Sequence, residues 1–250
     1  MEAIPSSAKR GISGSTLKLI AVAAMALDHT AWCLFDPQLS AQLCPTFPQL
    51  APFTALQAYP SLYILSYLFH IIGRITFPLM LFFLTEGLTH TRNIYRYGGS
   101  LLVFAFLSEI PFDLAFSGTA YDPAEQNVFF TLFLCLIAMY AIRKLPHRPA
   151  LTVLIVLLCG ICAWLLRSDY GHCGVISACV MELLRKEKSR AYSLGCVTAT
   201  LLSPWECAAL MALPAVQAYN GSRGRRLKYA FYLFYPLHLL LLYLLKLFIL

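Results

Sequence analysis

The chain has 250 residues, of which 59% are hydrophobic and 12% are charged, and its formal net charge at pH 7 is +7. A soluble domain carries about 25% charged residues, so this composition excludes an ordinary soluble protein and predicts a multi-pass membrane protein. No part of the sequence is long and polar enough for a separate soluble domain. We therefore expect a cytoplasmic tail over residues 1–16 and one integral-membrane domain over residues 17–250.

Apolar runs of near-spanning length follow one another along the whole chain. They lie at residues 17–35, 61–90, 98–117, 127–142, 150–166, 171–184, 191–203, 205–219 and 229–249. A transmembrane helix needs about 20 predominantly apolar residues, so the runs between 171 and 219 are short, and the pair at 191–219 is the least regular. The pattern predicts an all-α fold, a polytopic membrane bundle of about nine transmembrane helices.

The basic residues of the loops predict how these helices are oriented. When the loops are numbered alternately, one set holds all but three of the 19 Lys and Arg residues. Cytoplasmic loops carry the excess of positive charge, so we expect a cytoplasmic N-terminus and an extracytoplasmic C-terminus in the cytoplasmic membrane of a bacterium. Topology and contact with membrane lipids explain the net charge. No nucleic-acid partner is expected, because that would need a basic face on a soluble fold.

Ionisable residues occur near the middle of two predicted helices. The first helix carries Asp28 and His29 within "AMALDHTAWCLF", where a charged side chain costs about 2.5–3.5 kcal/mol. With a rise of about 1.5 Å per residue, His238 lies at a similar depth, ten residues beyond Lys228. Tyr235 precedes His238 by three residues and shares its helix face.

Two further helices carry polar pairs on a single face. His70 and Arg74 are four residues apart, as are Glu109 and Asp113, and residues at this spacing are neighbours on a helix. Intramembrane ionisable residues usually face the bundle interior and pair with one another. We therefore predict one polar site built by the first, second, third and ninth helices. The alternative is that Arg74 makes only a structural ion pair, with Glu109 or Asp28.

The other acidic residues are expected nearer the membrane surfaces. Asp169 and His172 fall in an outer loop within "RSDYGHCG", while Glu86 and Glu182 are expected near the cytoplasmic interface, where a charge costs little. The CxxC at 159–162 has neither a second cysteine pair nor a histidine at zinc-binding spacing. No metal is therefore expected.

Six blocks of the sequence, in order, resemble the signature blocks of the TraX family. They are "LKLIAVAAMALDHTAWCLF", "HIIGRITFPLMLFFLTEGLTHTRN", "LLVFAFLSEIPFDLAFSG", "NVFFTLFL", "SDYGHCGVI" and "KYAFYLFYPLHLLLLYLL". The family is named for a membrane protein that N-acetylates pilin, and it is similar to the wider transmembrane acyltransferase superfamily. The resemblance implies transfer of an acetyl group from cytoplasmic acetyl-CoA to an acceptor on the opposite side, with a buried histidine as the catalytic residue.

On this chain the resemblance implies that His29, in the "DH" of the first block, is the catalytic residue. The remaining polar positions of the family blocks are matched by Arg74, Glu109, Asp113, Asp169, Tyr235 and His238. It does not imply a particular acceptor, which we expect to be an amine or hydroxyl of a peptide N-terminus or a cell-envelope glycan.

Acetyl transfer needs a base near neutrality, and histidine is the usual choice. Asp28, Glu109 or Asp113 is expected to orient His29, and Arg74 to stabilise the oxyanion or to pair with the acids. We expect the catalytic group to contain His29, Asp28, Arg74, Glu109, Asp113 and His238. The acceptor is expected to contact Asp169, His172, Tyr235 and His70. The CoA phosphates are expected to bind Arg92, Arg96, Arg143 and Lys144.

Two other kinds of function stay open at this point. A proton-coupled small-molecule transporter would use the same Asp, Glu and His residues as a relay and substrate site. A structural subunit would use them as ion pairs only.

Overall fold

The computed structural model describes residues 11–41, 56–225 and 228–249. Within these ranges the chain is mainly helical and contains no β-strand. The helices are α1 (Gly14–Thr30), the π-helix η1 (Ala31–Phe35), α2 (Asp36–Ala41), α4 (Pro60–Gly73), α5 (Thr76–His90), α6 (Ile94–Phe116), α7 (Val128–Lys144), α8 (Pro149–Leu165), α9 (Gly171–Leu183), α10 (Lys188–Ala199), the 3₁₀ helix η3 (Pro204–Ala212), α11 (Leu213–Gln217) and α12 (Lys228–Ile249). The all-α prediction is confirmed.

Each of the nine apolar runs coincides with a helical segment, but the segments differ in length. Among the described residues, four segments are long and apolar enough to cross a membrane, namely Gly14–Ser40, Pro60–His90, Ile94–Phe116 and Ala230–Ile249. The helices from α7 to α11 are shorter than a full span. Large apolar side chains are exposed along α8, including Leu154, Leu157 and Trp164, as a lipid-facing helix requires. The structure thus supports a membrane protein, while nine spans and the orientation of the termini stay predictions.

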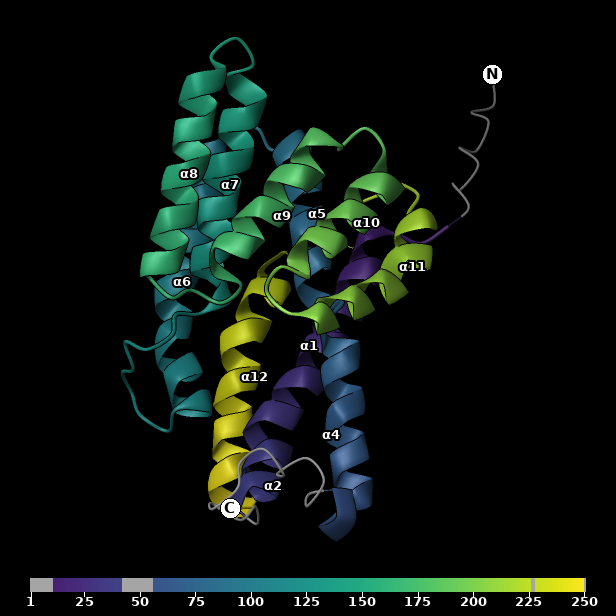
Figure 1. The fold of residues 1–250 in the computed structure, drawn as a ribbon, viewed down its shortest axis with the longest axis vertical. Helices are drawn as coiled ribbons and strands as arrows, with labels where there is room; N and C mark the ends of the chain where they lie inside the picture. The colour runs from purple at the N-terminus through teal and green to yellow at the C-terminus, as the bar shows by residue number, and fades with distance from the viewer. Residues whose placement is uncertain (1–10, 42–55, 226–227, 250) are drawn as a thin grey trace, which may run out of the picture.

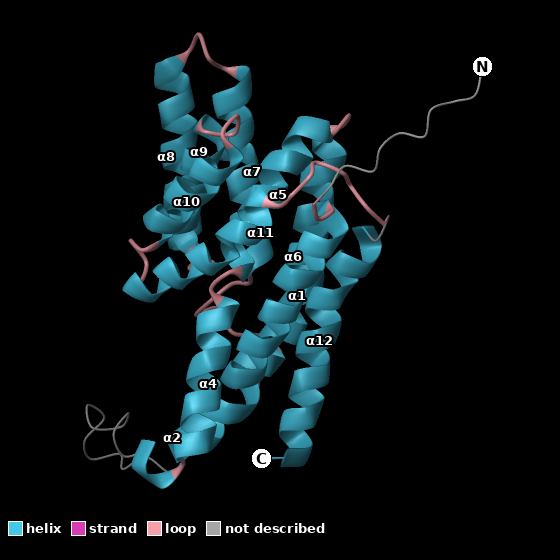
Figure 2. Cartoon of the chain, turned by 90° about the vertical axis from the view of Figure 1, so that its right-hand side faces the viewer, coloured by secondary structure: helices cyan, strands magenta, loops and turns pink. Residues whose placement is uncertain are grey.

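The helices lie at two levels along the long axis of the molecule. In Figure 1, α1, α4 and α12 lie side by side in the lower part, and α7 to α11 lie in the upper part. The quarter-turned view agrees (Figure 2). The helices α4 and α5 connect the two levels, because α4 packs on α1 and α5 packs on α9. The place where the levels meet is therefore formed by α1, the α4–α5 junction, α12 and the loop before α9.

The long segment Pro60–His90 is broken at Arg74 and Ile75, which form a turn between α4 and α5. Pro78 explains the break, because proline has no N–H to donate to the Arg74 carbonyl, four residues earlier, and its ring would clash with it. In the first turn of a new helix the missing N–H costs nothing. The break places a charged residue at a helix end in the interior of the molecule.

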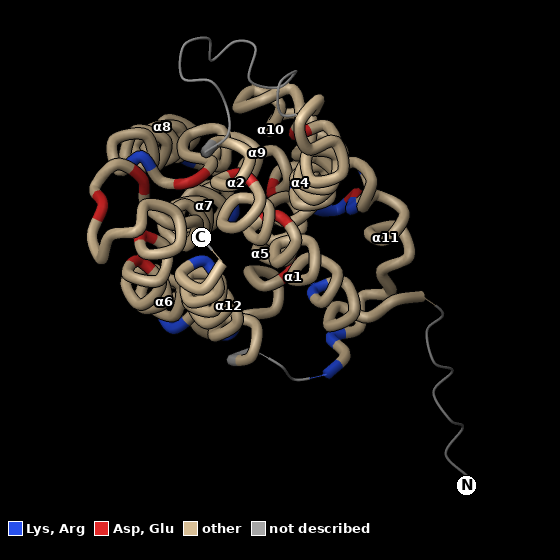
Figure 3. The backbone as a smooth tube through the Cα atoms, turned by 90° about the horizontal axis from the view of Figure 1, so that it is seen from below, with Lys and Arg blue, Asp and Glu red and all other residues tan. Residues whose placement is uncertain are grey.

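Acidic residues lie both inside the bundle and on its outer loops, as the view from below shows (Figure 3). Glu182 is one of the interior ones and is fully buried. Its depth relative to the membrane stays a prediction, but its carboxylate is withdrawn from solvent inside the protein. It forms ion pairs with Arg143 at 2.7 Å and Arg185 at 3.1 Å. These two cations offset the free-energy cost of burying its carboxylate.

Candidate functional site

His29 lies in the last turn of α1 and contacts a second histidine. Its Nδ1 is 2.7 Å from Nε2 of His238, and the two rings are stacked at 4.9 Å. The Nδ1 of His238 is in turn 2.8 Å from the carbonyl oxygen of Phe234. The predicted meeting of the first and last helices at one depth is therefore correct.

This chain of contacts fixes which nitrogen carries each proton. A carbonyl oxygen only accepts, so Nδ1 of His238 donates to Phe234, and Nε2 of a neutral His238 is left as an acceptor. Nδ1 of His29 then donates to it. The Nε2 of His29 keeps a free lone pair, which is the arrangement of a general base whose tautomer is held by a neighbour.

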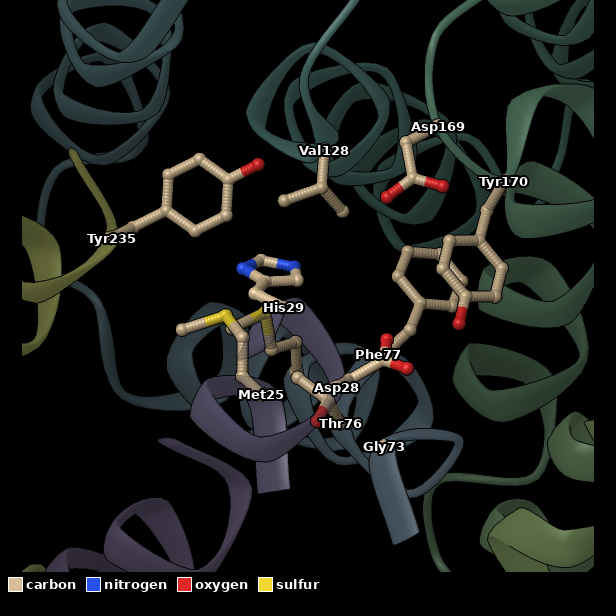
Figure 4. Close-up of a pocket in the computed structure, with 11 residues that line it drawn as sticks. Met25, Asp28, His29, Gly73, Thr76, Phe77, Val128, Asp169, Tyr170 and Tyr235 are labelled. Atoms are coloured by element: carbon tan, nitrogen blue, oxygen red, sulfur yellow. The ribbon is translucent and has the colours of Figure 1, made fainter. Parts of the chain in front are cut away.

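His29 faces a small cavity of about 40 Å³. In the close-up (Figure 4), the side chains of His29, Tyr235 and Asp169 lie around a common space. The cavity is lined by Met25, Asp28, His29, Gly73, Thr76, Phe77, Met80, Val128, Asp169, Tyr170 and Tyr235. A water needs about 10–15 Å³ by this measure, so the cavity has room for two or three waters or for a two-carbon acyl group.

Asp28 turns away from His29 and contacts the second helix. Its Oδ1 is 2.7 Å from Nδ1 of His70 and 3.3 Å from Nη2 of Arg74. Adjacent residues on a helix point about 100° apart, so Asp28 and His29 contact different helices. The structural ion pair between Arg74 and Asp28, one of the alternatives that the sequence left open, is present.

His70 also contacts a second carboxylate that the sequence interpretation missed. Its Nε2 is 2.9 Å from Oδ2 of Asp36, whose Oδ1 accepts a hydrogen bond from Ser66 at 2.6 Å. In a regular α-helix, Asp36 would lie about 80° around from Asp28. The π-helix η1, in which the Asp36 N–H bonds to the Ala31 carbonyl, has wider turns and reduces this angle. No spacing rule based on 3.6 residues per turn reveals the contact.

Arg74 bridges Asp28 to a fully buried acid on η3. Its Nη1 is 2.8 Å from Oε1 of Glu206, and its Nε donates to the His70 carbonyl at 3.2 Å. In the sequence, Glu206 is the second residue of the apolar run at 205–219, and no other signal marks it. A second, larger pocket of about 270 Å³ lies on this side, lined by Trp32, Tyr67, His70, Ile71, Arg74, Ser203 and Trp205.

Glu109 and Asp113 do not orient His29. Glu109 accepts hydrogen bonds from the side chain and backbone of Asn127, the N-cap of α7. Asp113 accepts from the Asp122 backbone N–H at 2.9 Å. Both carboxylates hold the loop between α6 and α7, and the neighbour of His29 Nδ1 is a histidine. We expected Asp28, Glu109 or Asp113 to orient His29. Among the described residues, His238 holds this position instead.

The loop before α9 brings Asp169 and Tyr170 to the cavity. Tyr170 has a left-handed backbone with φ 62° and stacks on Phe77 at 3.7 Å. Such strain in a non-glycine residue is held by its surroundings and is common at functional sites; here Thr131 donates to the Asp169 carbonyl. The surrounding protein withdraws the Asp169 carboxyl from bulk water, and this raises its pKa to about 7, although Arg74 opposes the shift.

The remaining predicted residues lie away from the cavity. His172 is exposed on α9 and does not line either pocket. Among the predicted phosphate ligands, Arg92, Arg96 and Lys144 are exposed. Arg143 instead makes two bonds to Glu182, at 2.8 and 2.7 Å, and one to Thr89. Its guanidinium is therefore engaged within the protein.

Comparisons with known proteins agree with the sequence blocks. A family model described as "TraX protein" matches residues 13–246. A protein of Dichelobacter nodosus, named "Probable fimbrial assembly protein FimC, serogroup H1", is 31% identical over 209 residues, which are 80% of this chain and 75% of that protein. No solved structure matches the chain. With a family model that covers nearly its whole length, this chain belongs to the TraX family.

Proposed function

We propose that the protein is a membrane-embedded acetyltransferase that uses acetyl-CoA and has His29 as its general base. The observation that carries the proposal is the hydrogen-bonded chain from His29 through His238 to the Phe234 carbonyl. It leaves a basic imidazole nitrogen beside a cavity that has the size of an acetyl group. A protein that needed only ion pairs would have no use for this arrangement.

The chemistry follows from the positions of the side chains. Nε2 of His29 takes a proton from the attacking amine or hydroxyl as the new bond to the acetyl carbon forms. The same nitrogen then gives that proton to the sulfur of CoA as the C–S bond breaks. Asp169 and Asp28 line the cavity, where they attract an acceptor that arrives as an ammonium ion. The Asp169 carboxylate takes the proton that this ion loses before the neutral amine attacks.

The two substrates would reach the site from opposite sides of the membrane. The exposed Arg92, Arg96 and Lys144 would meet the phosphates of cytoplasmic acetyl-CoA. This direction of transfer assumes the expected topology: one domain over residues 17–250 in a bacterial cytoplasmic membrane, with about nine spans and a cytoplasmic N-terminus. The helical segments at all nine apolar runs and the four long apolar helices support the membrane bundle, and the basic residues of alternate loops support its orientation.

The acceptor would be a peptide N-terminus of a surface-fibre subunit, with a cell-envelope glycan as the other candidate. The name of the Dichelobacter nodosus relative, a probable fimbrial assembly protein, supports the first. The two cavity carboxylates also favour an amine over a neutral hydroxyl, because they attract an ammonium ion.

The test is transfer of label in inverted membrane vesicles from the native host, with acetyl-labelled acetyl-CoA outside. We expect label in an envelope macromolecule when the vesicles contain the wild-type chain, and none with His29→Ala. His147, an exposed histidine between α7 and α8, gives a matched control, and His147→Ala should label normally. Equal labelling by the wild type and His29→Ala, or none by the wild type, would refute the proposal.

A second candidate is proton-coupled transport, and one observation favours it. A continuous chain of hydrogen bonds runs from the end of the molecule at α2 to its interior. It is formed by Ser66, Asp36, His70, Asp28 and Arg74. In proteoliposomes with an internal pH dye, a transporter would move protons when its substrate is added, without acetyl-CoA. The acetyltransferase releases CoA thiol instead.

A further inference from the structure

Acyl transfer places a negative charge on the thioester oxygen, and a positioned donor must stabilise it. Arg74, the candidate from the sequence, is poorly placed for this role. Its three nitrogens contact the His70 carbonyl, Asp28 and Glu206, and it lines the larger pocket instead of the cavity beside His29. Another donor is therefore needed on the wall of the His29 cavity.

Tyr235 lies on that wall. It is only 2% exposed, and its ring packs edge-on against His29 at 5.9 Å and against Phe129 at 5.1 Å. In Figure 4, its hydroxyl points across the top of the cavity toward Val128. The two ring contacts fix the side chain, so the hydroxyl is held in place before any substrate binds.

The hydroxyl meets the beginning of α7. Val128 is the first residue of this 17-residue helix, and its backbone N–H lies near the Tyr235 oxygen without forming a hydrogen bond to it. The phenol keeps its own hydrogen to donate. In the part of the chain that the structure describes, no side chain or carbonyl forms a hydrogen bond with this hydroxyl. The positive end of the helix dipole also makes this wall favourable for a negative charge.

We infer that Tyr235 is a catalytic residue, whose hydroxyl donates a hydrogen bond to the carbonyl oxygen of the thioester. The inference rests on the proposed acetyl transfer. As the acceptor attacks, the π electron pair of the C=O bond moves to the oxygen, and the bond from Tyr235 strengthens. As the C=O bond re-forms, the electron pair of the C–S bond leaves with sulfur, which takes its proton from His29. Tyr235 keeps its own proton throughout.

The first test compares the kinetics of Tyr235→Phe with those of the wild type. Loss of one oxyanion donor typically lowers kcat by about 10²–10³, and we expect a fall in this range with KM for acetyl-CoA within about twofold. The matched control is Tyr192→Phe, which removes a buried hydroxyl that donates to the Ala209 carbonyl away from the cavity. It should lower the melting temperature and leave kcat unchanged. A Tyr235→Phe protein with wild-type kcat would overturn the inference.

The second test does not depend on turnover. Acetyl-CoA labelled with ¹³C at the carbonyl is bound to His29→Ala protein, and the carbonyl band is recorded by infrared difference spectroscopy. We expect the carbonyl band of bound acetyl-CoA at a lower frequency than that of free acetyl-CoA. In the double variant His29→Ala/Tyr235→Phe, the band should return toward the frequency of free acetyl-CoA. Incorporation of 3-fluorotyrosine at position 235, which retains the ring and makes the hydroxyl a stronger donor, should lower the frequency further.

The outcomes separate this inference from the proposed function. If acetyl-CoA binds but its carbonyl band has the same frequency with tyrosine, phenylalanine or 3-fluorotyrosine at position 235, the role of Tyr235 is overturned and the proposed acetyl transfer is not. Acetyl-CoA that binds to neither protein would overturn the proposed function, and the inference with it.

Discussion

The contact between His29 and His238 predicts different outcomes for two substitutions of His238. His238→Leu removes the acceptor of the His29 Nδ1–H at 2.7 Å. A buried donor without a partner costs about 1–3 kcal/mol, or roughly a 5- to 150-fold population shift toward other ring orientations and the other tautomer. In that tautomer Nε2 carries the proton and cannot act as a base. We expect kcat to fall by about 100-fold.

His238→Gln tests the reason for this fall. The glutamine amide oxygen can accept from His29 Nδ1, so we expect kcat within about tenfold of the wild type. The assay is release of CoA thiol from acetyl-CoA by purified protein, with each variant checked for a cooperative thermal transition and a single size-exclusion peak. If His238→Leu were as active as the wild type, or if His238→Gln were as impaired as His238→Leu, the orienting role of His238 would be refuted.

Three further predictions concern other residues. Glu182→Gln breaks the buried pair with Arg143 and should lower the unfolding free energy by about 3 kcal/mol in a denaturing-detergent titration, whereas Glu187→Gln, in an exposed pair, should change it little. Asp169, with its pKa raised to about 7, binds its proton more tightly in the folded chain than in the unfolded one. Stability is therefore lost as pH rises from about 4 to about 7, so Asp169→Asn should raise the melting temperature at pH 8 and not at pH 4. Met80 lines the small cavity, and Met80→Ala should raise kcat/KM for butyryl-CoA relative to acetyl-CoA by about 10-fold; an unchanged ratio would show that the cavity does not hold the acyl group.

The sequence predicted the parts of the site that depend on depth and regular spacing. His29 and His238 were placed at one level by counting residues from basic helix ends, and they touch. Asp28 and Arg74 were recognised as an ion-pair alternative because both are charges inside apolar runs, and they pair at 3.3 Å. These inferences need only a helical rise of 1.5 Å per residue and the cost of burying charge.

The parts that failed depend on departures from regular helix or on tertiary packing. The π-helix Ala31–Phe35 turns Asp36 toward His70, and no residue type marks such a segment in advance. Arg143 was expected to bind phosphates because it belongs to a basic loop on the predicted cytoplasmic side, but Glu182 on another helix engages it. The burial of Glu206 arises from the packing of η3 beside the α4–α5 break. Partner choice between distant helices cannot be read from spacing along one of them.

The side-by-side Asp28 and His29 thus have separate tasks. Asp28 joins His70 and Arg74 in an ion-pair cluster that ties α1 to the α4–α5 break. His29 points to the cavity and to α12. An aspartate and a histidine in an apolar helix are tolerated because each has a partner on a neighbouring helix.

The most direct test of acetyl transfer by His29 is the rate of CoA thiol release from acetyl-CoA by the purified wild type and by His29→Gln, in the same detergent and at equal melting temperature. The account predicts that the wild type releases thiol and that His29→Gln is slower by about 10²–10⁴. Equal rates in the two proteins would contradict it.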